Sequence, residues 1–456
     1  MSFRFRSVCL TGLALAVATG SCSRARVGPP PGFAVVRFEN LSGDPGLEWL
    51  GRAASEVLST SLAGALDGPV LSTSSVGRLD VARGAHPAAA PGISAQRTAA
   101  ILAGARHVIS GYFEQTPGGV RIQAIEEDIA TGKTVGTYTV AGPASLETLL
   151  KMAKAVAPGA RPYLTSSNDA VRFYDSAIEA PQANAEAGLN QAIAADPNFG
   201  PAWTVLIRVA SAKGDKAGAL QLADKALARK IDSLSAATVK LERATLLADE
   251  KGRAAALAEV IDLSPGDTTL VRQLAESKTA SGEFAAAALL WKRLATVLPE
   301  DVDAWNQLGY TRAWGGDYPG AVSALQEYAR LRPNEPNPAD STGDVHFLYR
   351  KYAEAASSYL QAVAKDPGFG NGSSLYKAAW AKFLAGDKAG ADKAFAQLRE
   401  MREKAGVTHL KLFEADWLFR TGREKEGIAL LRKDLEAEQP ETQAVYHGQL
   451  AIWALL

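Results

Sequence analysis

Residues 302–335 read VDAWNQLGYTRAWGGDYPGAVSALQEYARLRPNE, a stretch of 34 residues with a proline near its end. Proline recurs at the same place in the repeat from residue 197 to residue 367, and every gap between these prolines is 34 residues or twice 34. A fixed period of this length is the sequence signature of a repeat array, in which each unit buries one face against its neighbours. The prolines are Pro197, Pro265, Pro299, Pro333 and Pro367, with Ile231 at the one skipped position.

The stretch 302–335 also resembles the tetratricopeptide (TPR) family. The family's usual tyrosine on the first helix is replaced by Arg312, and Tyr310 stands two places earlier. The resemblance implies two antiparallel helices per unit, stacked into an all-α superhelical solenoid. Small residues on both helices would let the pair approach closely. The residues that carry the likeness are Trp305, Leu308, Gly309, Ala321, Leu325 and Pro333.

Adding or subtracting 34 extends the array over residues 166–456, as about eight units and a lone final helix. The segment GDKAG occurs at 214–218 and again at 386–390, which is five periods plus two residues apart. This spacing predicts a two-residue insertion near Asn371. The unit 234–267 keeps the period but lacks the glycine turn between its helices.

The resemblance implies that the first helix of each unit lines a concave groove, with positions 2, 5, 9 and 12 facing it. These positions turn from polar to aromatic towards the C-terminus, and aromatic anchors beside a few fixed charges suit a protein-binding surface. The alternative is that Trp380, Phe383 and Phe419 pack between helices instead. The candidate groove residues are Arg272, Glu276, Asp303, Asn306, Tyr310, Asp344, Phe347, Tyr376, Trp380, Phe383, Asp416 and Phe419.

Residues 33–158 predict a separate α/β domain. The run FAVVRF at 33–38 is rich in strand formers and ends at a turn, Asn40 to Gly46. A long amphipathic helix follows, and a helix at 145–156 closes the unit. Strands at 106–113, 120–129 and 134–140, with a short one near Val70 and a helix at 95–102, complete an order typical of a mixed sheet.

Three motifs in this domain resemble the TolB N-terminal-like domain. They are FAVVRFENLSGDP at 33–45, GARHVISG at 104–111, and RIQA at 121–124 with ATGK at 130–133. The resemblance implies a non-enzymatic module for protein interaction or coupling. The loop from Asn40 to Gly46 could instead hold a phosphate at a helix start, but it lacks the residues of a P-loop or dinucleotide motif. A turn with a helix cap is the favoured interpretation.

The N-terminus predicts export. Arg4 and Arg6 precede a mostly apolar stretch to Gly20, so residues 1–21 fit a secretory signal peptide. The residues before Cys22 resemble the lipobox of bacterial lipoproteins, which implies a lipid anchor on Cys22 in the periplasm or outer membrane. The alternative is cleavage after Ala18, which leaves Cys22 as a lone thiol. Residues 22–32 would form a short tether to the first domain.

The charge balance and the few histidines and cysteines of the chain argue against some classes of function. The 456 residues carry 49 basic and 49 acidic side chains, and a net charge of zero argues against nucleic acid as a partner. Five scattered histidines, two cysteines and the lack of a catalytic motif give no reason to expect an enzyme, a metal or a cofactor.

These observations favour a non-enzymatic scaffold or adaptor of the bacterial cell envelope, which binds proteins through the groove and the α/β domain. The alternative is a ligand- or partner-sensing component of an envelope signalling system. A polysaccharide-processing enzyme is the third possibility, and it would need a catalytic constellation that the sequence does not display.

Overall fold

The computed structural model describes residues 32–77, 94–179, 185–407, 410–436 and 440–454. The predicted signal peptide, Cys22 and most of the tether lie outside these described residues.

The N-terminal part is a small mixed sheet, as the sequence predicts. Strands β1 (Gly32–Val35) and β2 (Glu39–Asn40) both pair in parallel with β3 (Ala105–Thr116). Strands β3, β4 (Gly119–Asp128) and β5 (Lys133–Gly142) pair antiparallel in sequence order. In place of a strand near Val70 there is a single parallel bridge to Phe33.

The first loop is shorter than the sequence predicts, because Asn40 belongs to β2. Asp44 then caps the short 3-10 helix Pro45–Leu47, and its Oδ1 accepts a hydrogen bond from the Gly46 amide at 2.8 Å. A carboxylate already fills this helix start, so the loop has the turn-and-cap geometry rather than that of a phosphate cradle.

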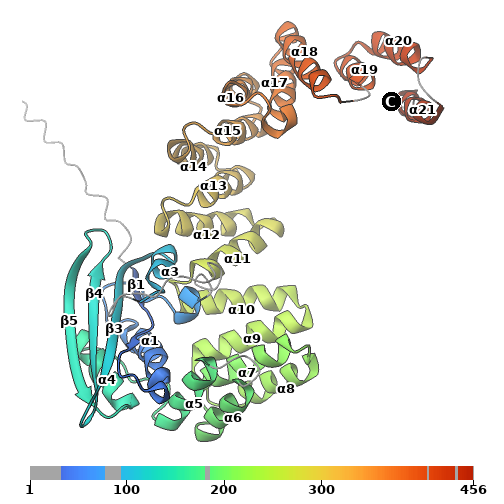
Figure 1. Ribbon diagram of the computed structural model, residues 1–456. Helices are drawn as coiled ribbons and strands as arrows, with labels where there is room; N and C mark the ends of the chain where they lie inside the picture. The colour runs from blue at the N-terminus through green and yellow to red at the C-terminus, as the bar shows by residue number, and fades with distance from the viewer. Residues whose placement is uncertain (1–31, 78–93, 180–184, 408–409, 437–439, 455–456) are drawn as a thin grey trace, which may run out of the picture.

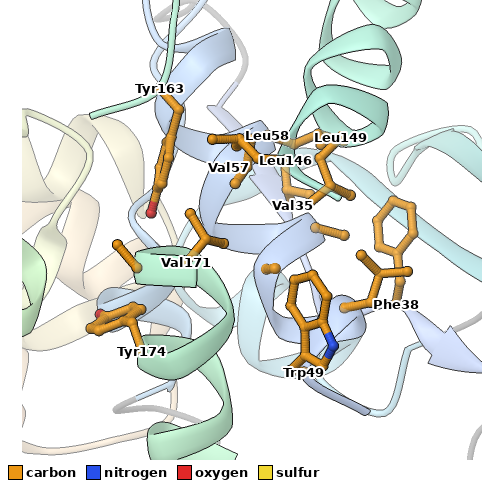
Figure 2. Close-up of a cluster of buried hydrophobic side chains, with 14 of the residues drawn as sticks. Val35, Phe38, Trp49, Val57, Leu58, Leu146, Leu149, Tyr163, Val171 and Tyr174 are labelled. Atoms are coloured by element: carbon orange, nitrogen blue, oxygen red, sulfur yellow. The ribbon is translucent and has the colours of Figure 1, made fainter. Parts of the chain in front are cut away.

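Helices α1 (Glu48–Leu62) and α4 (Leu146–Val156) pack together beside the sheet, and α3 (Arg97–Leu102) precedes β3. The buried face of α1 is mainly apolar, with Leu50, Val57 and Leu58 each at 0% exposure, and it also carries Ser55, Ser59 and Ser61. This core does not end with the α/β part. It continues into the first helix of the array through Val171 and Tyr174 (Figure 2).

The rest of the described chain is helical, and the helices follow one another in pairs along a curved row (Figure 1). The α/β part lies beside the first half of this row. The helices are α5 (Asn168–Glu179), α6 (Ala185–Ala195), α7 (Gly200–Ala212), α8 (Lys216–Leu227), α9 (Ser233–Leu247), α10 (Glu250–Leu263), α11 (Thr268–Ala280), α12 (Phe284–Val297), α13 (Val302–Trp314), α14 (Tyr318–Leu331), α15 (Asn337–Leu348), α16 (Tyr352–Lys365), α17 (Ser373–Leu384), α18 (Lys388–Lys404), α19 (Leu410–Arg420), α20 (Glu424–Leu435) and α21 (Pro440–Ala454).

The period of the sequence is the period of these pairs. Second helices begin at residues 216, 250, 284, 318 and 352, each 34 after the one before, and then at 388. The two extra residues fall at the 3-10 turn Phe369–Gly372, where Gly370, Asn371 and Gly372 have positive φ. The structure therefore places the insertion near Asn371, where the sequence predicts it.

Close approach within a pair depends on small residues, again as the sequence predicts. A Cβ added to Gly309 on α13 would lie 2.7 Å from the Leu325 side chain on α14. A Cβ added to Gly343 on α15 would lie 2.5 Å from the ring of Tyr359 on α16. Both distances are below van der Waals contact, so the large partner fills the space that glycine leaves.

Candidate binding groove

Three of the candidate groove residues meet in one hollow. Tyr310 on α13 and Asp344 and Phe347 on α15 line a cavity of about 330 Å³ between these helices. Trp314, Leu348 and Tyr359 line the same cavity. Positions 34 residues apart on successive first helices are therefore adjacent in space, as expected for a stacked array.

A polar network forms one wall of this hollow. The Tyr310 hydroxyl donates to Asp344 Oδ2 at 2.9 Å, and the Tyr359 hydroxyl donates to Asp344 Oδ1 at 2.8 Å. Lys377 on α17 donates to Asp344 Oδ2 at 3.0 Å and to Asp340 Oδ2 at 2.7 Å. One carboxylate thus joins three consecutive helix pairs, and such a shared network rigidifies the surface that it lines.

The network raises the pKa values of Tyr310, Tyr359 and Lys377. Burial, together with the charge of Asp344, raises the pKa of Tyr310 and of Tyr359 well above the usual value for a phenol. Burial alone would lower the pKa of Lys377, but its hydrogen bonds to Asp340 and Asp344 outweigh that effect and raise it. Both tyrosines therefore stay protonated donors, and Lys377 stays charged, at neutral pH.

An exposed apolar row runs beside the hollow. Trp314, Leu348 and Leu384 are the last residues of α13, α15 and α17, and they are 45%, 51% and 44% exposed. Trp314 stacks on Tyr310 at 5.4 Å between ring centroids, so the row is continuous with the candidate groove. A contiguous apolar patch on a polar surface is typical of an interaction site.

The expected groove positions of the repeat do not include this row. Its signal was the recurrence of a large apolar residue at position 13 of three units, one place beyond the position expected to face the groove. Exposure cannot be inferred from that pattern alone, because position 13 ends the helix and its side chain can turn either inward or outward.

The groove residues of the preceding pairs are mainly polar. Arg272 is not free, because it pairs with Asp301 and lies over the ring of Trp291 at 5.5 Å from its centroid. Glu276 and Asp303 are exposed, and neither forms an ion pair within the described chain. This part of the face therefore carries two carboxylates that are available to a cation.

Asn306 lies between these acids and the hollow. Its side-chain Oδ1 is buried and accepts no hydrogen bond from any described residue.

Towards the C-terminus the candidate aromatics form a cluster between α17 and α19. The rings of Trp380 and Trp417 are 5.1 Å apart, and those of Tyr376 and Phe413 are 5.6 Å apart. Phe383 contacts both tryptophans. Trp417 is buried and the other four rings are half-buried, so the cluster fills the space between these helix pairs.

The last two candidates lie on α19 itself. Asp416 forms an ion pair with Arg420 at 2.8 Å, one turn along the helix. Phe419 is covered by the final helix, because it stacks on Trp453 at 4.4 Å with an interplanar angle of 6°. The open part of the face thus lies between α11 and α17.

Comparisons with known proteins show only partial likeness. No family model matches the chain, and no curated protein sequence matches it. The crystal structure of MamA protein is similar at 18% identity and a TM-score of 0.34, over 39% of this chain and 96% of that one. MamA 41-end from Desulfovibrio magneticus RS-1 is similar at 14% identity and a TM-score of 0.32, over 38% of this chain and 97% of that one. Likeness at this level assigns no function.

Within the described ranges, no helix has the length and apolar character needed to cross a membrane. The same residues hold no cluster of three or more histidine, cysteine, aspartate or glutamate side chains that could bind a metal ion.

Proposed function

We propose that this protein is a non-enzymatic scaffold of the TPR type, which holds a segment of a partner protein on the face between α11 and α17. The observation that carries the proposal is the apolar row of Trp314, Leu348 and Leu384, exposed at the ends of three successive first helices. Trp314 and Leu348 also line the hollow that contains the candidate groove residues. Burying the exposed part of each side chain contributes about 1 kcal/mol to binding, so the row supplies part of the binding free energy and other contacts supply the rest.

The charge of the binding face indicates which residues the partner segment carries. The exposed carboxylates of Glu276 and Asp303 precede the row along the array. The partner segment therefore carries a lysine or arginine for these acids, followed by apolar side chains for Trp314, Leu348 and Leu384. The network around Asp344 holds this surface in one conformation before the partner arrives, which lowers the entropic cost of association.

The experiment places a photo-crosslinking side chain at Trp314 or at Leu348 in the native envelope. The control probe replaces Leu289 on α12, which is 72% exposed and belongs to a second helix. We expect the same discrete adduct from both groove probes, none from position 289, and loss of the adduct when Glu276 and Asp303 are both changed to Gln. Equal labelling from all three positions would contradict the proposed groove.

We further propose that the scaffold works in the bacterial envelope, where Cys22 carries a lipid. The support is in the sequence: the Arg-bearing apolar stretch 1–21, the small residues before Cys22, and the TolB-like motifs. Mass spectrometry of the N-terminal peptide tests this directly. A diacylated Cys22 is the expected result, whereas a free N-terminus at Thr19 would show that Ala18 precedes the cleavage site and that no anchor forms.

A further inference from the structure

A second and larger hollow lies between the α/β part and the helix pairs. Its volume is about 600 Å³, which is in the range of small-molecule sites. The residues that line it come from α1, the loop 69–74, the segment 161–164, and helices α5, α7 and α9. The walls therefore belong to two structural units that meet here, and such junctions are preferred places for ligands.

Two buried side-chain oxygens in this lining, Ser59 Oγ and Asp232 Oδ2, have no hydrogen-bond partner among the described residues. Tyr163 and Tyr174 line the cavity beside Ser59, and the three residues are 8%, 5% and 7% exposed. Both tyrosine rings pack against Phe199, at centroid distances of 5.9 and 5.3 Å, which fixes their orientation. In Figure 2 the two tyrosines lie at one edge of the core, away from Phe38. A buried hydroxyl group in a native protein normally has a partner, so the Ser59 hydroxyl points to a missing one.

The hydroxyl groups of Tyr163 and Tyr174 stay protonated at neutral pH, so they can donate hydrogen bonds to a ligand. Burial, followed by the charges of Glu56 and Asp175, raises the pKa of Tyr163 and of Tyr174 well above the ordinary value. A group that accepts hydrogen bonds, such as an oxyanion, is the complement of such a pair.

Three arginines reach the same cavity. Arg52 pairs with Glu56 at 3.3 Å and Arg208 with Glu242 at 2.6 Å. Arg161 forms no ion pair within the described chain, and its guanidinium lies over Gly64. A Cβ at Gly64 would be 2.6 Å from Arg161 Nη2, so the glycine leaves room for this cation.

The remaining lining restricts the ligand further. Apolar side chains cover part of the wall, including Val70, Leu164 and Val205. Two carboxylates, Glu56 and Asp232, also line the cavity, which disfavours a ligand with two negative charges. We infer that this cavity binds a small organic monocarboxylate with an apolar body, whose carboxylate accepts hydrogen bonds from Arg161 and from the hydroxyls of Ser59, Tyr163 and Tyr174.

Such a ligand would contact α1 on one side and α7 and α9 on the other. It would therefore stabilise the junction between the α/β part and the array, and binding would raise the melting temperature of the full chain. The inference stands independently of the groove between α11 and α17, because the two hollows share no lining residue.

Calorimetry and thermal melting of the purified chain test the site with three probes. These are 4-phenylbutyrate, the neutral 4-phenylbutanol, and phenyl phosphate. We expect 4-phenylbutyrate to bind and to raise the melting temperature, with at least tenfold weaker binding of the alcohol. Absence of binding by 4-phenylbutyrate at millimolar concentration, or equal binding of the alcohol, would overturn the proposal. Tighter binding of phenyl phosphate would overturn the assignment of a monocarboxylate.

Variants locate the binding within the cavity. Arg161→Gln should weaken 4-phenylbutyrate about tenfold, because a charge-assisted hydrogen bond is lost, whereas the exposed Arg229→Gln should bind like the parent chain. Ser59→Ala should also weaken binding and yet leave the ligand-free melting temperature unchanged or higher, since the hydroxyl has no partner to lose. Unchanged affinity in both Arg161→Gln and Ser59→Ala would place the ligand elsewhere and contradict the inference.

Discussion

From α7 to α20, each turn between the two helices of a pair passes through one residue in the left-handed conformation, and this residue is glycine in most of these pairs. The exceptions are Ala248 and Arg350, with φ of 55° and 57°. A side chain in this conformation costs about 1–2 kcal/mol, and glycine avoids that cost. Ala248→Gly should therefore raise the melting temperature, corresponding to about 1 kcal/mol of stability at that pair.

The reverse change is the control. Gly316 has φ of 88° at the matching turn, with nothing within 4 Å of an added Cβ, so Gly316→Ala changes conformational strain alone. It should lower the melting temperature by a similar amount. A destabilised Ala248→Gly variant would show that the left-handed turn is not what limits this pair.

The polar network around Asp344 predicts a specific response to alkaline pH. The pKa of Tyr359 is raised in the folded chain, so its contribution to stability is present below about pH 10 and is lost as the pH rises above that value. The raised pKa of Lys377 acts in the same direction. Tyr359→Phe removes one hydrogen bond to Asp344, which should cost about 1 kcal/mol near neutral pH.

Thermal melting of both proteins between pH 8 and pH 11 tests this account. Above pH 10 the melting temperature of the parent chain should fall more steeply than that of Tyr359→Phe. Only the parent has a phenol at this position, and that phenol ionises at a lower pH in the unfolded chain than in the folded chain. Two parallel curves would contradict the network. In a spectrophotometric titration, Tyr359 should not be among the tyrosines that ionise near pH 10, because its pKa is raised.

At the scale of the helix, the second helices α8, α10, α14 and α18 begin with the same cap. Asp215, Asp249, Asp317 and Asp387 each accept a hydrogen bond from the amide of the glycine three residues later. A Cβ on Gly320 would lie 2.0 Å from the Asp317 carboxylate, so glycine is required while the cap is in place. Gly320→Ala should displace the cap and lower the stability by about 1 kcal/mol.

A double-mutant cycle separates the cap from helix propensity. Once Asp317→Ala has removed the carboxylate, Gly320→Ala should become neutral or stabilising, because alanine favours a helix by about 1 kcal/mol over glycine. Urea unfolding of the four proteins provides the measurement. Additive effects would mean that the glycine is selected by something other than the cap.

The helix pairs and most of the strands are predictable from the sequence, because the residue patterns that indicate them are local and periodic. The 34-residue spacing predicts that Tyr310 and Asp344 are neighbours, and the structure joins them by a hydrogen bond of 2.9 Å. The strand order of the first domain follows from turn residues and alternation. By contrast, β2 pairs for only two residues, Glu39 and Asn40, and so short a segment carries no periodic signal.

At the scale of the whole molecule, the feature that the sequence could not predict is the continuous core between the α/β part and the array. The predicted domains end at 158 and begin at 166, but Val57 and Leu58 on α1 share one buried cluster with Val171 on α5 (Figure 2). Contacts between segments so far apart in the sequence produce no periodic pattern of residues from which they could be predicted. The same holds for the large cavity, since it exists only where these two parts meet.

A shared core makes the two parts unfold together, and Val171 tests this. Its side chain is fully buried, so Val171→Ala should cost about 2 kcal/mol. Because α1 packs on α5, hydrogen exchange should accelerate in α1 and α4 as well as in α5 and α6. Leu398→Ala on α18 is the matched control: Leu398 is equally buried but remote, and its effect should stay within the neighbouring pairs. Faster exchange confined to α5 and α6 in Val171→Ala would instead show two independent folding units that merely touch.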